Sequence, residues 1–201
     1  AERWALLSAG SRAAHPRQRA LLATLEWSYG LLEPEEQRLF AQLSVFSGTF
    51  TRQAVEAVCD TGDAGALLGR LLDCSLVQHV ELPDLGPRYR LLETLRVYAQ
   101  ERLVASDEAD AIRERHAAFY AGVAEQADPV VRSGVPEMRG VLRQMDADHE
   151  NLAAAMRWSL AQGRADLAIR IGAGAHYWTM YHARIRQYGE WVETALALPA
   201  P

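Results

Sequence analysis

The sequence predicts a mainly α-helical protein, in which a winged-helix domain with a small β-hairpin precedes an antiparallel helical segment. Three observations lead to this prediction. Apolar residues recur with the helical period along most of the 201 residues, one short region near residue 80 changes to the two-residue alternation of strands, and no strand pattern follows residue 106. We expect the winged helix at 17–104 and the helical segment at 105–201.

Three helical patterns occupy the first part of the predicted winged helix. The first covers about residues 17–32, and its apolar face consists of Leu21, Leu22, Leu25, Tyr29 and Leu32. Pro34 suits the first turn of a second helix, because a proline there loses no helical hydrogen bond, and Gly48 ends that helix. Thr51 can cap the short helix RQAVEAVC, since its hydroxyl can accept from a backbone N–H of the first turn.

A fourth helix and a hairpin complete this domain. The helix AGALLGRLLDCS follows a turn at residues 61–63. SLVQHVEL and RYRLL then alternate with period two on either side of the turn sequence PDLGP, which predicts two strands joined as a hairpin. The helical period returns in ETLRVYAQERLV. Short helices followed by one hairpin are the element order of a winged helix, with the hairpin as the wing.

Only helical patterns occur in the second half of the chain. Asp107 begins a helix that ADPVVRSGVP is expected to interrupt, and another helix begins near Pro136. Two more patterns follow, RADLAIRIGAGAHYWTMY and ARIRQYGEWVETALAL, and close packing of helices explains Gly172 and Gly174 in the first of them. These antiparallel pairs, each about 35 residues long, suggest the start of a helical repeat array.

Composition excludes several classes of protein. The formal net charge is −5 and there is no lysine, so the chain lacks the overall positive field that draws proteins to nucleic acids. Two isolated cysteines, Cys59 and Cys74, are too few for a disulfide framework, and we expect both to be reduced and buried. No apolar run reaches the roughly 18 residues that a membrane span needs, so we expect a cytoplasmic protein without membrane partners. The chain begins without Met, and we expect it to be part of a longer protein.

The residues indicate neither catalysis nor a metal site. Asp146, Asp148, His149 and Glu150 resemble metal ligands, but neighbouring helical positions diverge around the axis, and an acidic first turn of a helix explains them better. The chain has no Gly-x-Ser-x-Gly nucleophile motif, and without lysine it cannot form a phosphate-binding P-loop. We therefore expect no enzymatic activity, no catalytic residues and no metal ligands in this chain.

Two binding functions remain as alternatives. A DNA-binding winged helix would use the helix at about 64–74, with Arg70, and the wing, with Arg88 and Arg90. Residues 1–104 contain eleven arginines against thirteen acidic residues, which makes direct DNA contact the weaker hypothesis. The other alternative is a ligand-sensing pocket in the helical segment, although inter-helix core packing explains its aromatic residues better. These are Tyr177, Trp178, Tyr181 and Trp191.

Several strings together resemble one protein family. RQRALLATLEWSYGLLEPEEQRLFAQLSVFSGTFTRQAVEAVC, LLGRLLDCSLV and RYRLLETLRVYAQERL are similar to the winged-helix region of bacterial STAND-class signal-transducing ATPases. These occur in large transcriptional regulators, including relatives of the Streptomyces antibiotic regulatory proteins and large LuxR-type activators. ERWALLSAGSR resembles the tail of the nucleotide-binding domain, which makes 1–16 a linker. RERHAAFYAGVAE, DADHENLAAAMRWSL and GEWVETALAL resemble the segment that leads into tetratricopeptide-type repeats.

The resemblance implies a regulatory relay. In this family an upstream P-loop domain binds ATP or ADP with Mg, the winged helix packs on the nucleotide, and a separate domain usually contacts DNA. The implied partners are that NTPase domain, downstream helical repeats, and a protein or small-molecule effector. Related switch proteins carry Met-His-Asp after the wing, where this chain has Leu91, Leu92 and Glu93. Leu92 and Glu93 are thus the nucleotide-proximal positions, but Leu92 cannot hydrogen-bond a phosphate, and Glu93 is expected to cap the next helix.

Trp27 is the expected contact with the upstream domain. Tyr29 shares the inward face of its helix with Leu25 and Leu32, whereas Trp27 points about 200° away from Tyr29. We therefore expect Trp27 to be partly exposed in this chain.

Overall fold

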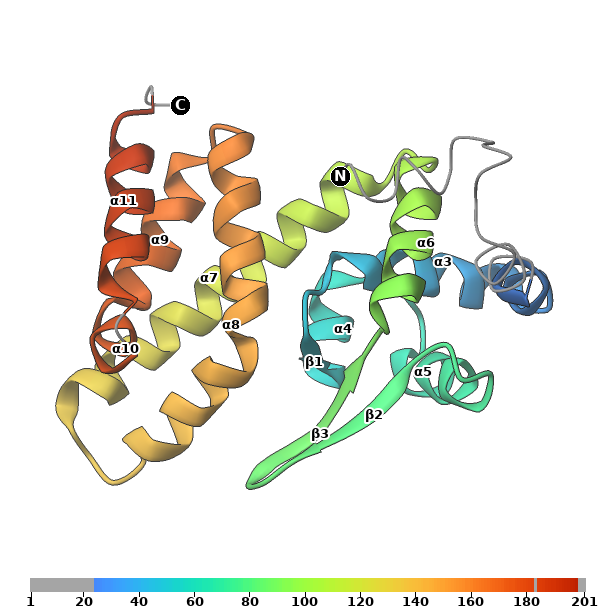
Figure 1. The fold of residues 1–201 in the computed structure, drawn as a ribbon, viewed down its shortest axis with the longest axis horizontal. Helices are drawn as coiled ribbons and strands as arrows, with labels where there is room; N and C mark the ends of the chain where they lie inside the picture. The colour runs from blue at the N-terminus through green and yellow to red at the C-terminus, as the bar shows by residue number, and fades with distance from the viewer. Residues whose placement is uncertain (1–23, 183, 199–201) are drawn as a thin grey trace, which may run out of the picture.

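The computed structural model describes residues 24–182 and 184–198, and it confirms the predicted mainly helical fold with a small antiparallel sheet (Figure 1). The predicted linker at 1–16 and the start of the predicted first helix lie outside the described residues. The described part of that helix covers residues 24–30. The elements that follow are α3 (Pro34–Gln42), the 3₁₀ turn η1 (Leu43–Val45), β1 (Thr49–Thr51), α4 (Arg52–Val58), α5 (Ala64–Asp73), β2 (Gln78–Leu82), β3 (Leu85–Arg90), α6 (Glu93–Val104), α7 (Ala109–Ser133), α8 (Met138–Ala161), α9 (Ala165–Gly174), α10 (His176–Tyr181) and α11 (Ile185–Leu196).

Side-chain caps determine where the helices of the first half begin. At α3, the Glu33 N–H donates to Glu36 Oε2 at 3.0 Å, and Pro34 occupies the first turn. The Thr51 hydroxyl accepts from the Ala54 N–H at 3.1 Å and starts α4, as predicted. Asp63 accepts from the Ala66 N–H at 3.0 Å and starts α5 in the same way.

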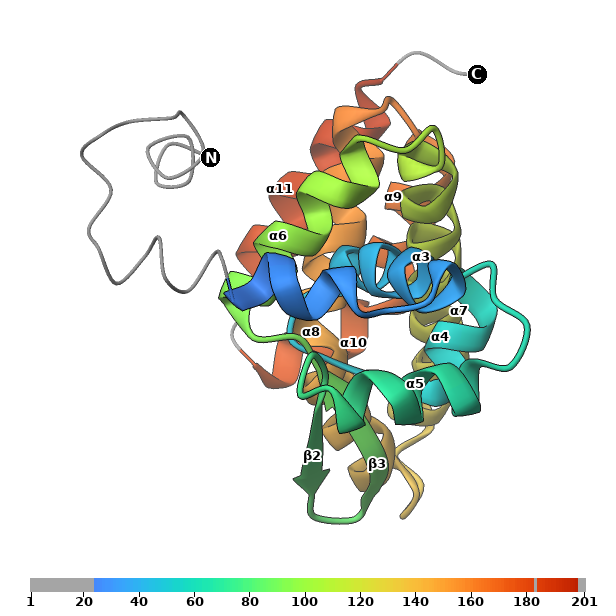
Figure 2. The ribbon, with the colours of Figure 1, turned by 90° about the vertical axis from the view of Figure 1, so that its right-hand side faces the viewer.

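The sheet contains one strand that the sequence did not predict. Its order is β1-β3-β2, and Phe50 of β1 is paired with Tyr89 of β3. The hairpin turn is only Pro83 and Asp84, and Asp84 adopts a φ of 61°, so β3 begins inside the segment predicted as a turn. Figure 2 shows the β2–β3 hairpin projecting beyond the helices, which makes it the wing.

The helical segment is built on the 25-residue helix α7, which leads away from the winged helix and packs against α8 and α9 (Figure 1). The interruption predicted in ADPVVRSGVP is wrong, because α7 continues through Pro129 to Ser133 and ends at Gly134, with a φ of 68°. Ala127 and Val131 on either side of Pro129 are buried, so core packing offsets the helical hydrogen bond that proline cannot make.

Close helix contacts explain the glycines of α9, as predicted. A Cβ at Gly174 would lie 2.5 Å from the carbonyl carbon of Ala124 and 2.6 Å from the Glu125 nitrogen in α7. A Cβ at Gly172 would collide with Val192 of α11. Apolar residues that recur every three or four positions in this region are all buried, namely Leu167, Ile171, Ala175 and Trp178.

One hydrophobic core extends through both halves of the chain, from Leu32 to Ala195. Phe46 connects the halves, because its ring stacks on Phe50 at 4.6 Å and contacts His116 and Tyr120 of α7 edge-on at 5.3 and 6.5 Å. Cys59 is buried as expected, but Cys74 is exposed at the end of α5. In the described part of the chain, no helix combines the length and the apolar character required to cross a membrane.

Candidate functional site: the wing–α8 junction

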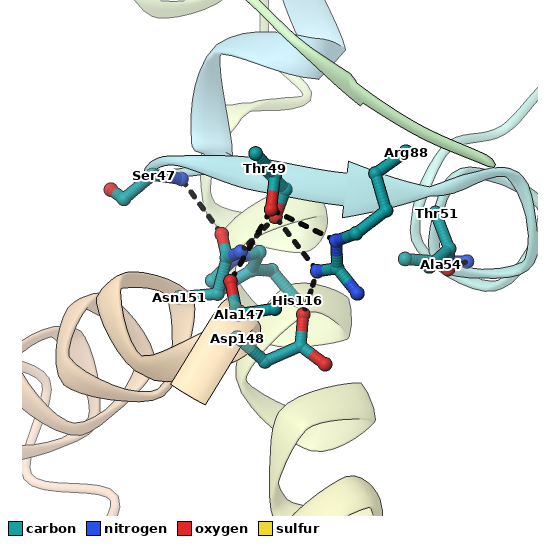
Figure 3. Close-up of polar contacts among 9 residues, drawn as sticks. All are labelled: Ser47, Thr49, Thr51, Ala54, Arg88, His116, Ala147, Asp148 and Asn151. Atoms are coloured by element: carbon teal, nitrogen blue, oxygen red, sulfur yellow. Dashed lines mark hydrogen bonds and ion pairs between the residues drawn. The ribbon is translucent and has the colours of Figure 1, made fainter. Parts of the chain in front are cut away.

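The wing and β1 contact the side of α8 through a set of polar side chains (Figure 3). We term this contact the wing–α8 junction. Its residues are Ser47, Thr49, Asp84, Arg88, Arg143, Ala147, Asp148 and Asn151.

Arg88 is the centre of the junction. Its guanidinium forms an ion pair with Asp148 of α8, and both side chains are almost fully buried. Arg88 Nε also donates to Thr49 Oγ1 at 2.9 Å, and Nη2 donates to the Thr49 carbonyl at 3.2 Å. Burial raises the pKa of Asp148, while the charge of Arg88 opposes this shift. Each charge therefore depends on the other to remain in the interior.

The burial of Arg88 corrects its predicted role as a phosphate contact on the wing. Positions 88 and 90 lie on the same face of β3, but only Arg88 reaches α8 and is buried (Figure 3), whereas Arg90, the last residue of the strand, is exposed. With 1% of its surface exposed, Arg88 is not accessible to a DNA phosphate in this structure.

Asn151 supplies the hydrogen bonds that the outer edge of β1 lacks. Its side-chain oxygen accepts from the Ser47 N–H at 2.7 Å, and its amide nitrogen donates to the Thr49 carbonyl at 2.8 Å. β1 is an edge strand, and edge strands carry backbone groups that need partners. Asn151 Oδ1 also lies 3.4 Å from His116 Nε2, so α7 joins the same network. Burial lowers the pKa of His116 to about 4, which keeps the ring neutral at pH 7.

Two further contacts extend the junction along α8. Asp84, at the tip of the wing, forms an exposed ion pair with Arg143. At the other end, Gly48 has a φ of +77°, and a Cβ there would collide with the Glu150 carboxylate. A glycine is therefore required where the chain enters β1.

The structure corrects the prediction of an acidic first turn. Asp146 and Asp148 lie in the middle of α8, which begins at Met138. Asp146 accepts from Trp178 Nε1 at 2.9 Å, whereas Asp148 pairs with Arg88 on a different side of the helix. No group of three or more His, Cys, Asp or Glu side chains suited to a metal ion occurs among the described residues.

The surface that would face DNA offers few unpaired positive charges. The Arg70 side chain of α5 is 60% exposed, but its Nε forms an ion pair with Oε1 of the buried Glu36 at 3.1 Å. The Nε of Arg90 donates to Oε1 of Gln78 at 3.2 Å. Residues 32–104 contain seven arginines against eleven acidic residues. Acidic side chains also pair with Arg38, Arg52 and Arg96. Much of the positive charge is therefore neutralised locally.

The other predicted site residues lie outside this junction. Trp27 is 67% exposed, in line with the expected exposure, and Leu92 is 40% exposed. Glu93 does not cap α6: Leu92 is the N-cap residue, and the Glu93 carboxylate binds Arg96 at 2.9 Å. Contacts of these residues with a nucleotide or an upstream domain remain predictions.

The aromatic residues predicted to line a pocket in the helical segment differ in burial, since some pack in the core and one lies on the surface. Trp178 is buried, with its ring 5.9 Å from that of Tyr188, whereas Tyr181 is 59% exposed. Trp191 is half-buried and packs on Tyr188 at 5.0 Å. For the two tryptophans, the core interpretation holds.

Sequence comparison agrees with the order of helices and strands. Residues 32–104 match the family model of a winged helix-turn-helix domain. This part of the chain is a winged helix. Its α5 occupies the position of the recognition helix, and β2 and β3 form the wing.

The relatives are much longer than this chain. Proteins of Mycobacterium tuberculosis and Mycobacterium bovis named "Putative HTH-type transcriptional regulator" are 33% identical over 196 residues, which is 95% of this chain but 22% of theirs. A Mycobacterium tuberculosis protein named "Uncharacterized protein" is 37% identical over 131 residues, 63% of this chain and 32% of its own length. The chain thus spans about a fifth of the length of the first relatives. No solved structure matches it significantly.

Proposed function

We propose that this chain is the relay of an ATP-dependent, STAND-type transcriptional regulator in the cytoplasm. In this proposal the winged helix couples an upstream NTPase domain, which binds ATP or ADP with Mg, to helical sensor repeats of the tetratricopeptide type. The chain itself has no catalytic role. The observation that carries the proposal is the wing–α8 junction, because a wing held on α8 by a buried ion pair is suited to an internal contact.

The connection from the nucleotide-proximal positions to α8 is short. Arg88 lies in β3, which ends at Arg90, and only Leu91 separates this strand from Leu92, the N-cap residue of α6. A force on Leu92 would therefore act on the strand that carries Arg88. A buried ion pair with fixed hydrogen bonds has few alternative geometries, so a displacement of β3 would move α8 or break the pair.

The length of the relatives supports this arrangement. A chain that matches 22% of a regulator leaves room in such a protein for an NTPase domain, further repeats and a separate DNA-binding domain. Trp27, exposed on the helix at 24–30, is the proposed contact with the NTPase domain.

Coupling across the junction tests the relay. We expect Leu92→Arg to change hydrogen exchange at residues 143–152 of α8 in the wild-type background. The change should disappear when Arg88→Met and Asp148→Leu replace the ion pair by apolar side chains of similar volume, which a buried site tolerates. Leu31→Arg, at another exposed leucine, is the matched control. If Leu92→Arg alters exchange only within α6, the relay is excluded.

DNA binding is the second candidate, favoured by the winged helix-turn-helix match and by the exposed Arg70 and Arg90. Fluorescence anisotropy with a labelled DNA duplex at low salt distinguishes DNA binding from the relay function. The relay predicts no saturable binding at the concentrations, about 1–100 µM, where non-specific DNA binding is usually seen. Binding that weakens with salt and in Arg70→Ala and Arg90→Ala, but not in Arg186→Ala on α11, would establish the alternative.

A further inference from the structure

A cavity of about 620 Å³ lies beside the wing–α8 junction. Its walls come from α7, from α8, and from residues 51 and 53 at the start of α4. Small-molecule sites in proteins usually have volumes of about 300–1,000 Å³ and lie where structural units meet. The cavity meets both criteria, because one wall belongs to the winged helix and the others to the helical segment.

The shape of the cavity depends on two glycines in facing helices. Gly122 of α7 and Gly140 of α8 both line it, and a Cβ at either position would meet no atom within 4 Å. Apolar side chains form much of the remaining wall, namely Phe119, Val123, Val141 and Met145. A larger side chain at either glycine would extend into the cavity.

Tyr120 gives the cavity a buried polar group. The residue is 1% exposed, lines the cavity, and its hydroxyl has no hydrogen-bond partner among the described residues. Burial raises the pKa of Tyr120, so the hydroxyl keeps its proton and remains a donor. Buried hydroxyls almost always have a partner, because an unpaired one destabilises the fold. Tyr120 lines the cavity, but its hydroxyl has almost no accessible surface, so a ligand becomes its partner only when a side chain of the wall moves aside.

The charges on the wall restrict the ligand. None of the described residues that line the cavity is basic, whereas Glu137 and Asp148 are acidic. An anionic ligand, including a nucleotide phosphate, would enter without a compensating charge.

We propose that this cavity binds a small, uncharged or amine-bearing molecule with an apolar body and a hydrogen-bond acceptor. The apolar body contacts Phe119, Val123 and Met145, and the acceptor binds the Tyr120 hydroxyl once a side chain of the wall has moved aside. Because residues 51 and 53 share the cavity with α7 and α8, the ligand contacts both sides of the wing–α8 junction. This proposal goes beyond the relay and does not depend on an NTPase domain.

Fluorescence titration of the 201-residue chain with the neutral dye prodan tests the site. Prodan has an aromatic body and a carbonyl acceptor, and its emission shifts to shorter wavelength in apolar surroundings. We expect saturable binding of one dye per chain, and weaker binding of the anionic dye anilinonaphthalene sulfonate. Absence of saturable prodan binding, or equal binding of both dyes, would overturn the proposal.

Cavity-filling variants locate the dye. Gly122→Leu and Gly140→Leu should each abolish prodan binding, and both replace glycine in a helix, which favours folding. Gly69→Leu in α5 is the matched control, since its Cβ also meets open space and the residue lies away from the cavity. Prodan binding that persists in both folded Leu variants would contradict the proposed location.

Tyr120→Phe provides a measurement that does not depend on the Leu variants. Removing a hydroxyl without a partner leaves the packing of the ring intact, so this variant should fold as well as the wild type. Its affinity for prodan should fall roughly five-fold through loss of one hydrogen bond. An unchanged affinity would overturn the proposed hydrogen bond between the ligand and this hydroxyl. The hydrogen-exchange test of the relay is unaffected by either result.

Discussion

At the scale of single residues, Arg88 and Asp148 show how a charged pair can determine where a wing lies. Both side chains are almost fully buried, so removing one leaves the other charge without compensation. We expect Arg88→Ala to lower the free energy of unfolding by about 3–5 kcal/mol, measured by urea denaturation. Arg186→Ala, which removes an exposed arginine of α11, should change it by less than about 0.5 kcal/mol. Equal effects of the two variants would contradict the buried-pair interpretation.

His116 makes stability depend on pH. Burial lowers the pKa of His116 to about 4, although its hydrogen bond with Asn151 opposes this shift. Below the ordinary pKa of about 6.5, the unfolded chain takes up a proton that the folded chain does not bind. The contribution of His116 to the free energy of unfolding is therefore constant above this pH and declines as the pH falls toward 4. At pH 5 the loss is about 2 kcal/mol.

Comparison with His116→Gln isolates this effect. We expect the stability advantage of the wild type over this variant to shrink by about 2 kcal/mol between pH 7.5 and 5, in urea unfolding experiments. Asp148 and the other carboxyl groups are present in both proteins, so most of their titration cancels in the difference. An advantage that stays constant over this range would show that His116 binds its proton equally in the folded and unfolded chains, and would contradict the lowered pKa.

At the scale of elements, the contact between α7 and α9 depends on a glycine. A Cβ at Gly174 would lie 2.5–2.8 Å from backbone atoms of Ala124 and Glu125, which cannot move without shifting α7. We expect Gly174→Ala to destabilise the chain by about 1–3 kcal/mol in thermal or urea unfolding, despite the higher helix propensity of alanine. Gly189→Ala in α11, where a Cβ meets open space, should be neutral or stabilising. A neutral Gly174→Ala would contradict the close approach of these helices.

The elements also show what a sequence can predict. Apolar periodicity and local caps were sufficient to predict α3, α4, α5 and the hairpin, because these signals depend on residues a few positions apart. β1 was missed because its three residues are too few to display an alternation, and it exists through pairing with β3. The continuation of α7 through Pro129 depends on tertiary packing, which no local signal reports.

The junction was beyond the reach of sequence reasoning for the same reason. Arg88 and Asp148 are 60 positions apart, and only the folded chain brings them together. The alternation along β3 assigns Arg88 and Arg90 to one face, so it gave no signal that Arg88 alone is buried. The register shift between Val80 and Leu82 lies on the other side of Arg88, toward the hairpin tip, and residues 88–90 pair regularly with residues 78–80.

At the scale of the whole molecule, the winged helix and the helical segment share one hydrophobic core. Phe46 of the winged helix stacks on Phe50 and also packs directly on His116 and Tyr120 of α7. In addition, Asn151 of α8 hydrogen-bonds the edge strand of the sheet. A relay requires this property, because two units that move independently cannot transmit a displacement. Ligand binding in the cavity beside the junction would act on the same contact.

A shared core predicts that the chain unfolds as one cooperative unit. We expect native-state hydrogen exchange to give opening free energies for the slowest amides of α4 and α9 that agree within about 1 kcal/mol, and both should equal the global free energy of unfolding from urea denaturation. Phe46→Ala, which removes the ring between the halves, should lower the value for both helices together, by about 3–5 kcal/mol. If α4 opens with a much lower free energy than α9, or if Phe46→Ala affects only one of them, the halves fold independently. Displacements of the wing would then be absorbed at the junction before they reach the helical segment.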